Sequence, residues 1–301
     1  MASITRICAI LFPFCVAAPP AFGVELVPDP PLRCDACDGW NRPHEPFRVF
    51  GNTFYVGTAE LASILVVTDA GLVLLDGALP QSAPAIAANL ATLGYKLDDV
   101  KLILNSHTHH DHAGGLAALQ RASGAAVAAS PRSAEALRRG GPTPDDPQFG
   151  MPDHAFPSLV KVREIADGER LNVGSTAFTA HFTPGHTPGS TTWTWTACEV
   201  KRCLAVVYAD SLNAVSADGF RFSGGEGRPS LAESFRHSID IVSRLPCDIL
   251  LAPHPGFAQL EQKFERSKRG ESDAFVDAAG CRNYAASASL RLGQRLREEQ
   301  R

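Results

Sequence analysis

The sequence predicts one α/β domain in which two mixed β-sheets pack together with helices on the outside. Short β-runs alternate with helical segments from about residue 52 onward, and the second half of the chain repeats the theme of the first. The 301 residues, 45% of them hydrophobic, would allow one large domain or two. Because composition does not change between the halves, we expect a single domain over residues 24–301.

Residues 1–23 have the features of a secretory signal peptide, which would be removed from the mature protein. Arg6 supplies a positive start, and the apolar run at 7–18 is short and interrupted by proline. Ala21 and Gly23 place small residues where a signal peptidase reads, so cleavage is expected after Gly23. No later segment is long and apolar enough to cross a bilayer, which predicts an exported, periplasmic protein that does not enter the membrane.

The six cysteines that follow this segment are even in number, which in an oxidising compartment predicts disulfides. They are Cys34, Cys37, Cys198, Cys203, Cys247 and Cys281. Cys198 and Cys203 flank a short polar turn between two β-runs, as hairpin partners do. Cys247 and Cys281 are expected to join the last strand to the C-terminal segment. The pair at 34 and 37 favours a local disulfide or a flexible, partly oxidised arm over a redox pair or half a zinc knuckle.

The first half of the chain has a regular order of elements before a long irregular stretch. We expect β-runs at 52–56, 63–68, 71–76, 101–105 and 125–129, and helices at 81–93, near 114–122 and near 131–138. Residues 140–158 are rich in proline and glycine and show no periodicity. A loop this long in a compact domain is usually functional or disordered.

The second half shows the same alternation of strands and helices. We expect β-runs near 160–165 and at 176–182, 190–196, 203–208 and 248–252, with helices at 230–245 and about 284–299. In the 190–196 run, Trp193 and Trp195 share one face. Apolar residues recur at helical spacing in 230–245.

The most informative stretch is 101–115, where a buried strand runs into His107, His109, Asp111 and His112. Burying these groups without compensation would be costly. A divalent metal is the simplest compensation, because imidazole and carboxylate are natural zinc ligands. His107 and His109 can share one ion, while Asp111 and His112 can turn towards a second. The alternative to a metal site, a His-rich surface loop, does not explain four histidines within positions 107–112.

Other polar residues also stand directly after β-runs. His186 lies between proline and glycine residues, Asp210 and Ser211 follow the 203–208 run, and His254 follows 248–252. Strand ends at one edge of a sheet converge, so these residues are candidates to complete the site. The remaining histidines are expected to be surface or structural residues: His44, His110, His154, His181 and His237.

Four motifs in this order, HTHHDH, PGHTPG, YADSL and PHPG, resemble those of the metallo-β-lactamase superfamily. The stretches FRVFGNTFYVGT, DPQFG and TWTW followed by a close cysteine pair look most like its subclass B3. The resemblance covers Trp40 to the C-terminus. It implies an αββα sandwich with two zinc ions at one edge of the sheets. The implied ligands are His107, His109 and His186 for the first zinc, and Asp111, His112 and His254 for the second.

The resemblance also implies roles around the ions. Many superfamily hydrolases bridge the metals with an Asp after the YADSL strand, whereas subclass B3 has a Ser that is not a ligand, which Ser211 matches. Asp210 next to it remains the alternative bridging ligand. Asp111 is implied both as ligand and as the catalytic residue that orients the nucleophile. Ser211 and Asn213 would bind the substrate carboxylate, and Gln148 and Phe149 would wall the site.

The implied reaction is hydrolysis of the β-lactam amide bond of penicillins, cephalosporins and carbapenems, which would confer antibiotic resistance. A zinc-bound hydroxide would attack without a covalent enzyme intermediate. The alternatives are another dinuclear zinc hydrolase, such as a thioesterase or lactonase, and a binding protein with a degenerate metal site. A net charge of −4 gives no electrostatic case for nucleic acid or an anionic membrane as partner. The expected partner is a small-molecule β-lactam substrate, and the protein is expected to be a monomer.

Overall fold

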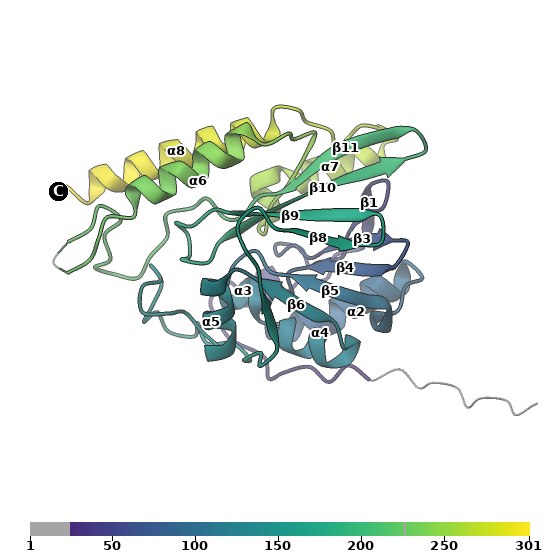
Figure 1. Cartoon of the computed structure of the whole chain (residues 1–301), viewed down its shortest axis with the longest axis horizontal. Helices are drawn as coiled ribbons and strands as arrows, with labels where there is room; N and C mark the ends of the chain where they lie inside the picture. Colours follow the sequence, from purple (N-terminus) through teal and green to yellow (C-terminus); the bar gives the residue numbers. More distant parts are fainter. Residues whose placement is uncertain (1–24, 226) are drawn as a thin grey trace, which may run out of the picture.

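The structure, a computed structural model, describes residues 25–225 and 227–301. The segment expected to be a signal peptide, 1–23, lies outside the described residues. The described chain forms two β-sheets, one of seven strands and one of five. They lie one above the other in Figure 1, with helices on both outer sides.

The seven-stranded sheet keeps the order of the sequence, β1-β2-β3-β4-β5-β6-β7. Its strands are β1 Phe47–Phe50, β2 Thr53–Tyr55, β3 Ile64–Thr68, β4 Gly71–Leu75, β5 Val100–Leu104, β6 Ala126–Ala129 and β7 Val162–Glu164. The first four pair antiparallel through short connections. From β4 to β7 the strands are parallel because longer crossovers join them. The carboxyl ends of β4, β5 and β6 therefore meet at one edge.

The five-stranded sheet has the order β12-β11-β10-β9-β8. Its strands are β8 Arg170–Val173, β9 Thr176–Phe182, β10 Thr191–Glu199, β11 Arg202–Tyr208 and β12 Ile249–Leu251. Successive hairpins make β8 to β11 antiparallel, and β12 returns parallel to β11. The carboxyl ends of β9, β11 and β12 consequently point the same way.

Helices cover the outer faces of both sheets. They are α1 Cys37–Trp40, α2 Ala83–Thr92, α3 His110–Ala113, α4 Leu116–Ser123, α5 Pro131–Arg139, α6 Ala232–Arg244, α7 Leu260–Lys268 and α8 Gly280–Glu298, with short 3-10 turns η1 Pro80–Ser82, η2 Leu97–Asp99 and η3 Pro255–Ala258. In Figure 1, α2, α4 and α5 lie against the seven-stranded sheet, and α6 and α8 lie together over the other one.

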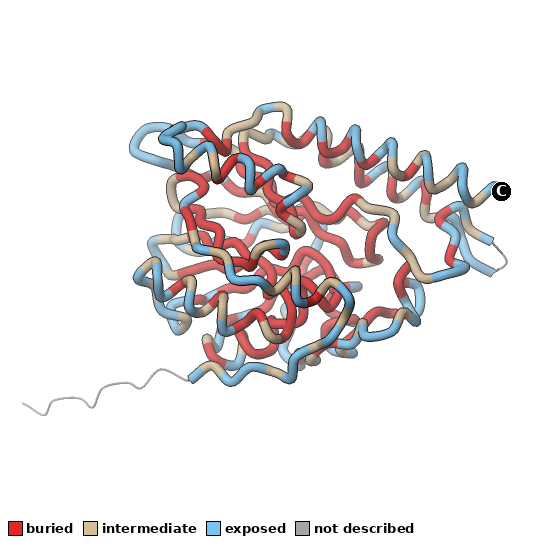
Figure 2. Tube along the Cα trace, turned by 180° about the vertical axis from the view of Figure 1, so that it is seen from behind, coloured by how far each residue is buried: buried red, intermediate tan, exposed pale blue. Residues whose placement is uncertain are grey.

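The core between the sheets is apolar and continuous. Trp193, Phe178 and Tyr208 of one sheet pack in the same cluster as Ile64 and Leu104 of the other. Figure 2 shows this buried band running through the molecule. Trp193 and Trp195 do share the buried face of β10, as the alternation predicted. Two further clusters hold the helices on the outer faces. The predicted αββα sandwich is therefore confirmed.

Several elements were not predicted from the sequence. These are β1, β8, α1, α3 and α7. β1 and β8 are short strands at sheet edges, where pairing with a neighbour rather than local pattern decides the conformation. The helix α3 begins inside the HTHHDH motif, because Gly114 and Gly115 let the chain pass close to Gly77 and Pro80.

The structure pairs the six described cysteines as Cys34–Cys37, Cys198–Cys203 and Cys247–Cys281. Cys198 and Cys203 are also direct neighbours in the β10–β11 register. Their oxidation in the exported protein stays a prediction.

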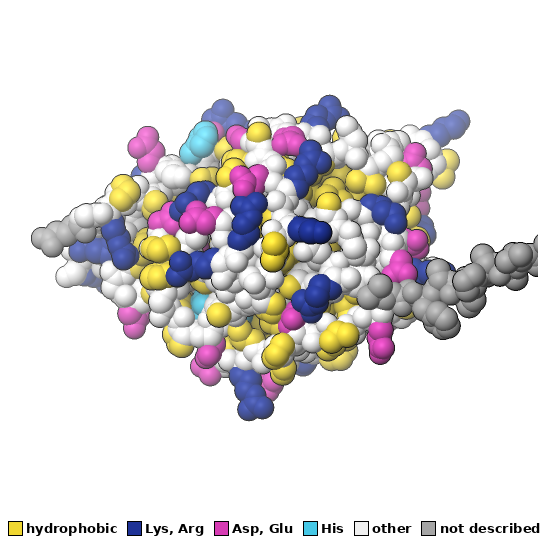
Figure 3. Space-filling view, turned by 60° about the horizontal axis from the view of Figure 1, so that its bottom comes forward, with side chains coloured by type: hydrophobic (Ala, Val, Ile, Leu, Met, Phe, Trp, Pro, Cys, Tyr) yellow, Lys and Arg dark blue, Asp and Glu magenta, His cyan; other side chains and the backbone are white. Residues whose placement is uncertain are grey.

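Within the described ranges, no helix combines the length and the apolar character needed to cross a bilayer. Basic and acidic side chains are interspersed over the face shown in Figure 3.

Candidate metal centre

Strand ends bring the candidate ligands to one edge of the sandwich. His107 and His109 follow β5, and His186 lies in the turn between β9 and β10. Asp210 follows β11, and His254 follows β12. These strands end on the same side because β9, β11 and β12 run in one direction, and β5 faces them across the core. Residues about 150 positions apart in sequence thus meet in one place.

His107, His109 and His186 form the first group, in which each ring offers one nitrogen within 4.8 Å of the others. The Nδ1 of His109 lies 3.1 Å from the Nε2 of His186. Ligands of a tetrahedral zinc with bonds of about 2.0–2.1 Å would stand roughly 3.3 Å apart. The spacing of this group is therefore that of a shared metal ion.

In each ring of the first group, the nitrogen that faces away from the group has a hydrogen-bond acceptor, and this contact determines which nitrogen carries the proton. The Nδ1 of His107 lies 2.7 Å from Asp210 Oδ1, and the Nδ1 of His186 lies 2.7 Å from the carbonyl oxygen of Asn213. The Nε2 of His109 lies 3.2 Å from Asp146 Oδ1. Carboxylate and carbonyl oxygens accept hydrogen bonds, so these nitrogens donate. In its neutral form, each ring then has a lone pair on the nitrogen that faces the group.

Asp111, His112 and His254 form the second group. Asp111 Oδ2 lies 3.2 Å from the Nε2 of His112 and 3.2 Å from the Nε2 of His254, and the two nitrogens are 3.3 Å apart. His254 Nδ1 donates to the carbonyl oxygen of Glu60 at 3.3 Å, which leaves its Nε2 free to face the group. His107 also lies within reach of Asp111 and His112, so the two groups are adjacent.

The donor set fits a metal ion. The Nε2 of His107 is buried and has no hydrogen-bond partner, a costly state for an imidazole nitrogen unless a cation faces it. Burial holds the pKa of His107 and of His186 well below the usual value, so both rings are neutral, as metal ligation requires. Nitrogen and carboxylate donors suit zinc among the common metals. The two groups therefore have the donors and the spacing to hold metal ions.

Asp210 lies behind His107 and outside both groups. The side chains of Asp210 and His107 are both fully buried. The Asp210 carboxylate accepts a hydrogen bond from the Nδ1 of His107, the nitrogen that points away from the first group. Burial raises the pKa of Asp210 to about 6. Ser211, the next residue, is buried, and its hydroxyl has no hydrogen-bond partner.

Asp76 supports the site and was not singled out from the sequence. Its carboxylate accepts from the backbone N–H of Ser106 at 2.7 Å, the Ser106 hydroxyl at 2.5 Å, the Asn105 amide at 3.2 Å and the Tyr208 hydroxyl at 2.8 Å. Burial raises the pKa of Asp76 to about 7, while the donors favour its charged form. Asp76 directly follows β4, so its place at a strand end was a signal that could have found it.

The long 140–158 loop contributes Asp146 and Gln148. Asp146, also not singled out from the sequence, is buried and contacts His109. Gln148 is 7% exposed and donates its backbone N–H to the same Asp146 oxygen. Phe149 is 41% exposed, and the Arg139 guanidinium lies over its ring.

The other histidines have structural surroundings or lie near the surface. His110 is buried, and its ring lies 4.6 Å from that of His154. Burial lowers the pKa of His110 to about 4. His44 contacts Glu261 at 3.1 Å, and His181 contacts the Thr194 hydroxyl at 3.0 Å.

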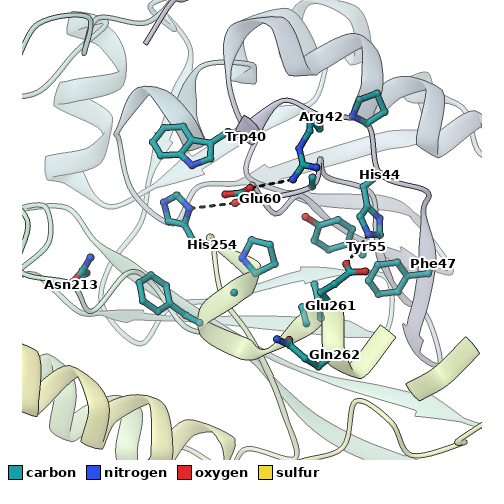
Figure 4. Close-up of a pocket in the computed structure, with 16 residues that line it drawn as sticks. Trp40, Arg42, His44, Phe47, Tyr55, Glu60, Asn213, His254, Glu261 and Gln262 are labelled. Atoms are coloured by element: carbon teal, nitrogen blue, oxygen red, sulfur yellow. Dashed lines mark hydrogen bonds and ion pairs between the residues drawn. The ribbon is translucent and has the colours of Figure 1, made fainter. Parts of the chain in front are cut away.

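A groove of about 930 Å³ opens beside the second group. Trp40 and Glu60 line it next to His254, and Asn213 stands at one end, as Figure 4 shows. Phe257 also lines the groove. The Trp40 ring lies 5.5 Å from the His254 ring, which makes one wall of the groove apolar. An organic molecule bound at the metal groups would have room to extend into this groove.

Comparison with known proteins agrees with this geometry. Residues 61–200 match the family profile described as the metallo-beta-lactamase superfamily. The structure is similar to that of Rm3 metallo-beta-lactamase, with 51% identity, a TM-score of 0.86 and coverage of 89% of this chain and 100% of that one. It is also similar to MEM-A1, a subclass B3 metallo-beta-lactamase from a soil metagenome library, with 46% identity, a TM-score of 0.84 and coverage of 87% and 98%.

The chain is also similar to a protein whose name gives an activity other than that of a β-lactamase. A hydroxyacylglutathione hydrolase of Cereibacter sphaeroides (strain ATCC 17025 / ATH 2.4.3) is 27% identical over 206 residues, which are 67% of this chain. The match spans 65% of the length of that relative.

Proposed function

The chain belongs to the metallo-β-lactamase superfamily, and from this premise we propose that it hydrolyses the β-lactam amide bond of penicillins, cephalosporins and carbapenems with two zinc ions. The observation that carries the proposal is the pair of adjacent donor groups, one of three imidazoles and one of two imidazoles with a carboxylate. The similarity to two metallo-beta-lactamases over nearly the whole chain favours β-lactams among the substrates of this fold.

His107, His109 and His186 would hold the first zinc, and Asp111, His112 and His254 the second. When bound, the metal supplies Lewis acidity that polarises the substrate carbonyl and lowers the pKa of an attacking water. The residues behind the ligands keep the rings in place: Asp210 holds His107, and the Asn213 carbonyl holds His186. Such partners fix both ring orientation and proton position.

Asp111 is the proposed catalytic residue. Burial opposes its charged form, but His112 and His254 hold the pKa of Asp111 well below its usual range. It is therefore a carboxylate at neutral pH. One oxygen faces the two histidines, which leaves the other to accept a hydrogen bond from the attacking water and orient it.

Ser211 and Asn213 are the proposed binders of the substrate carboxylate. The Ser211 hydroxyl is buried without a partner, so it has a hydrogen bond to donate. The Asn213 backbone oxygen accepts a hydrogen bond from His186, whereas the Asn213 side chain lines the groove. Gln148, whose backbone N–H donates to Asp146, is proposed to wall the site.

The proposal extends to the cellular setting. We place the mature protein in the periplasm as a monomer, where it would confer resistance to β-lactam antibiotics. The six paired cysteines agree with an oxidising compartment.

The test is hydrolysis of a carbapenem and a cephalosporin by purified mature protein, with and without a chelator. We expect turnover of both substrates, loss of turnover with dipicolinate or EDTA, recovery on adding zinc, and no inhibition by the serine-directed inhibitor clavulanate. Inactivation by clavulanate would contradict the metal mechanism.

The second candidate is a thioesterase or lactonase that uses the same metals. It is favoured by the match to a hydroxyacylglutathione hydrolase. Hydrolysis of S-lactoylglutathione or a lactone, without hydrolysis of either β-lactam, would select it.

A further inference from the structure

A buried side chain of the 140–158 loop, Asp146, contacts the first group. Asp146 is 2% exposed, and its Oδ1 lies 3.2 Å from the Nε2 of His109. The same oxygen lies 2.8 Å from the backbone nitrogen of Gln148, which donates to it. One atom therefore serves both a candidate ligand and the fold of the loop.

Hydrogen bonds within the loop hold this carboxylate in place. The Asp146 N–H donates to the Thr143 carbonyl at 2.8 Å, and the Phe149 N–H donates to the Asp146 carbonyl at 3.0 Å. The Pro147 carbonyl accepts from Ala217 at 2.9 Å, in the segment that follows Asn213. These hydrogen bonds fix the turn around Asp146, so the carboxylate has little freedom to move away from His109.

The contact decides which nitrogen of His109 can bind a metal. A carboxylate oxygen only accepts hydrogen bonds, so the Nε2 of His109 carries the proton and Nδ1 keeps the lone pair. That lone pair faces the Nε2 of His186 at 3.1 Å, which also has a lone pair because its Nδ1 donates to Asn213. The two lone pairs repel unless a proton or a metal ion lies between them, and a metal ion can bind both at once. A docked loop and a bound metal therefore favour each other.

We propose that Asp146 is a positioning residue that holds His109 ready for metal binding and couples the order of the 140–158 loop to occupancy of the first group. By linkage, whatever the bound metal adds to the stability of the docked loop, the docked loop adds to the affinity for the metal. The loop also carries Gln148, so filling the first group would set one wall of the site. The inference rests on metal binding and holds whichever substrate the protein hydrolyses.

Zinc affinity tests the positioning role without any substrate. We expect Asp146→Ala to lower the affinity of one zinc site roughly 10–100-fold, the usual effect of removing such a partner of a ligand. Asp146→Asn keeps an acceptor oxygen and should recover part of that loss. Competition with a chromophoric chelator measures both, and the visible spectrum of the cobalt-substituted protein should change in Asp146→Ala. Asp145→Ala is the matched control, because this neighbour pairs with Arg132 at the surface.

Hydrogen exchange tests the coupling. In the parent, peptides covering 143–149 should become more protected when zinc is added, and this gain should be absent in Asp146→Ala. An alanine variant that binds zinc as tightly as the parent, or an asparagine variant no better than the alanine one, overturns the positioning role. Protection of 143–149 that does not respond to zinc in the parent overturns the coupling, and this arm needs no variant to fold. Zinc binding as expected without β-lactam hydrolysis would contradict the proposed function alone.

Discussion

At the scale of single residues, the site depends as much on the partners of the ligands as on the ligands. Asp210, Asp146 and the Asn213 carbonyl each accept from the nitrogen of a histidine that faces away from the first group. Asp210 and Asn213 come from the segment after β11, and Asp146 comes from the 140–158 loop. The three lone pairs converge because three separate contacts turn the rings.

Mutations should remove the metal of one group without removing that of the other. His186→Ala removes a ligand from the first group only, and His254→Ala removes one from the second group only. Since the remaining ligands stay in place and water can fill the vacant position, each variant should fold and retain one tightly bound zinc while losing turnover. Elemental analysis with chelator titration measures the metal content.

A chromogenic cephalosporin adds a second readout for the same variants. The His254→Ala variant should release the ring nitrogen more slowly, which shows as a change in the anionic intermediate. If this variant binds two zinc ions and turns over at the parent rate, His254 is not a ligand.

Ser211→Ala should affect substrate binding without removing metal. The hydroxyl is proposed to bind the substrate carboxylate, and a hydrogen bond to a charged group contributes roughly 1.5–3 kcal/mol. We expect KM for a cephalosporin to rise at least about tenfold, with kcat changed much less and zinc content unchanged. Ser243→Ala, on the distant helix α6, is the control. Loss of zinc in Ser211→Ala would show a ligand at this position.

Asp76→Ala should destabilise the protein. It leaves the N–H and hydroxyl of Ser106 and the hydroxyl of Tyr208 buried without an acceptor. Each such group costs about 1–3 kcal/mol, so we expect a loss of at least about 3 kcal/mol in the free energy of unfolding. Urea denaturation of the zinc-free protein measures it. Tyr208→Phe removes a single donor and should cost much less, and equal losses in the two variants would show that Asp76 does not hold the Ser106 turn.

At the scale of elements, the strands fix the site and the disulfides hold its surroundings. β5, β9 and β12 end at the two donor groups, and the segments after them carry the candidate ligands. Cys247–Cys281 joins the chain just before β12 to the start of α8, and Cys198–Cys203 closes the β10–β11 hairpin.

The two disulfides should differ in their effect on stability. In the chain-entropy account, a bond closing 34 residues contributes roughly 4 kcal/mol, and one closing 5 residues about 2 kcal/mol. Cys247→Ser with Cys281→Ser should therefore lower the free energy of unfolding more than Cys198→Ser with Cys203→Ser. Denaturation of the exported proteins compares them. Mass mapping of unreduced peptides checks that the bonds form, and free thiols at all four positions would contradict export to an oxidising compartment.

At the scale of the whole molecule, the two donor groups combine side chains from both halves of the sandwich. One sheet supplies His107 to His112, and the other supplies His186 and His254. A metal bound here should link the halves and stabilise the fold. Zinc at a free concentration 100 times the Kd of one site adds about 2.7 kcal/mol, which should raise Tm by roughly 5–10 °C.

Thermal unfolding with and without zinc measures this effect. We expect about two zinc ions per chain by elemental analysis, and a Tm that falls on dialysis against EDTA and recovers with zinc. The His186→Ala variant should gain less from zinc than the parent. One tightly held ion with no gain on adding zinc would contradict the dinuclear site.

The sequence by itself determined the sandwich and the residues that come together at its edge. Alternating strand and helix patterns are local, and His107, His109, Asp111 and His112 follow a strand whose apolar run is visible in the chain. Their chemical types alone indicate a metal.

Only the tertiary structure decided how those residues are held and what lies beside them. Asp146 meets His109 across 37 residues, and Asp210 meets His107 across 103. No local pattern encodes such contacts, because they depend on how loops from different strands pack over the same edge. The groove lined by Trp40 and Phe257 likewise exists only where segments 40–60 and 254–262 fold together, since its walls are side chains about 200 positions apart in the sequence.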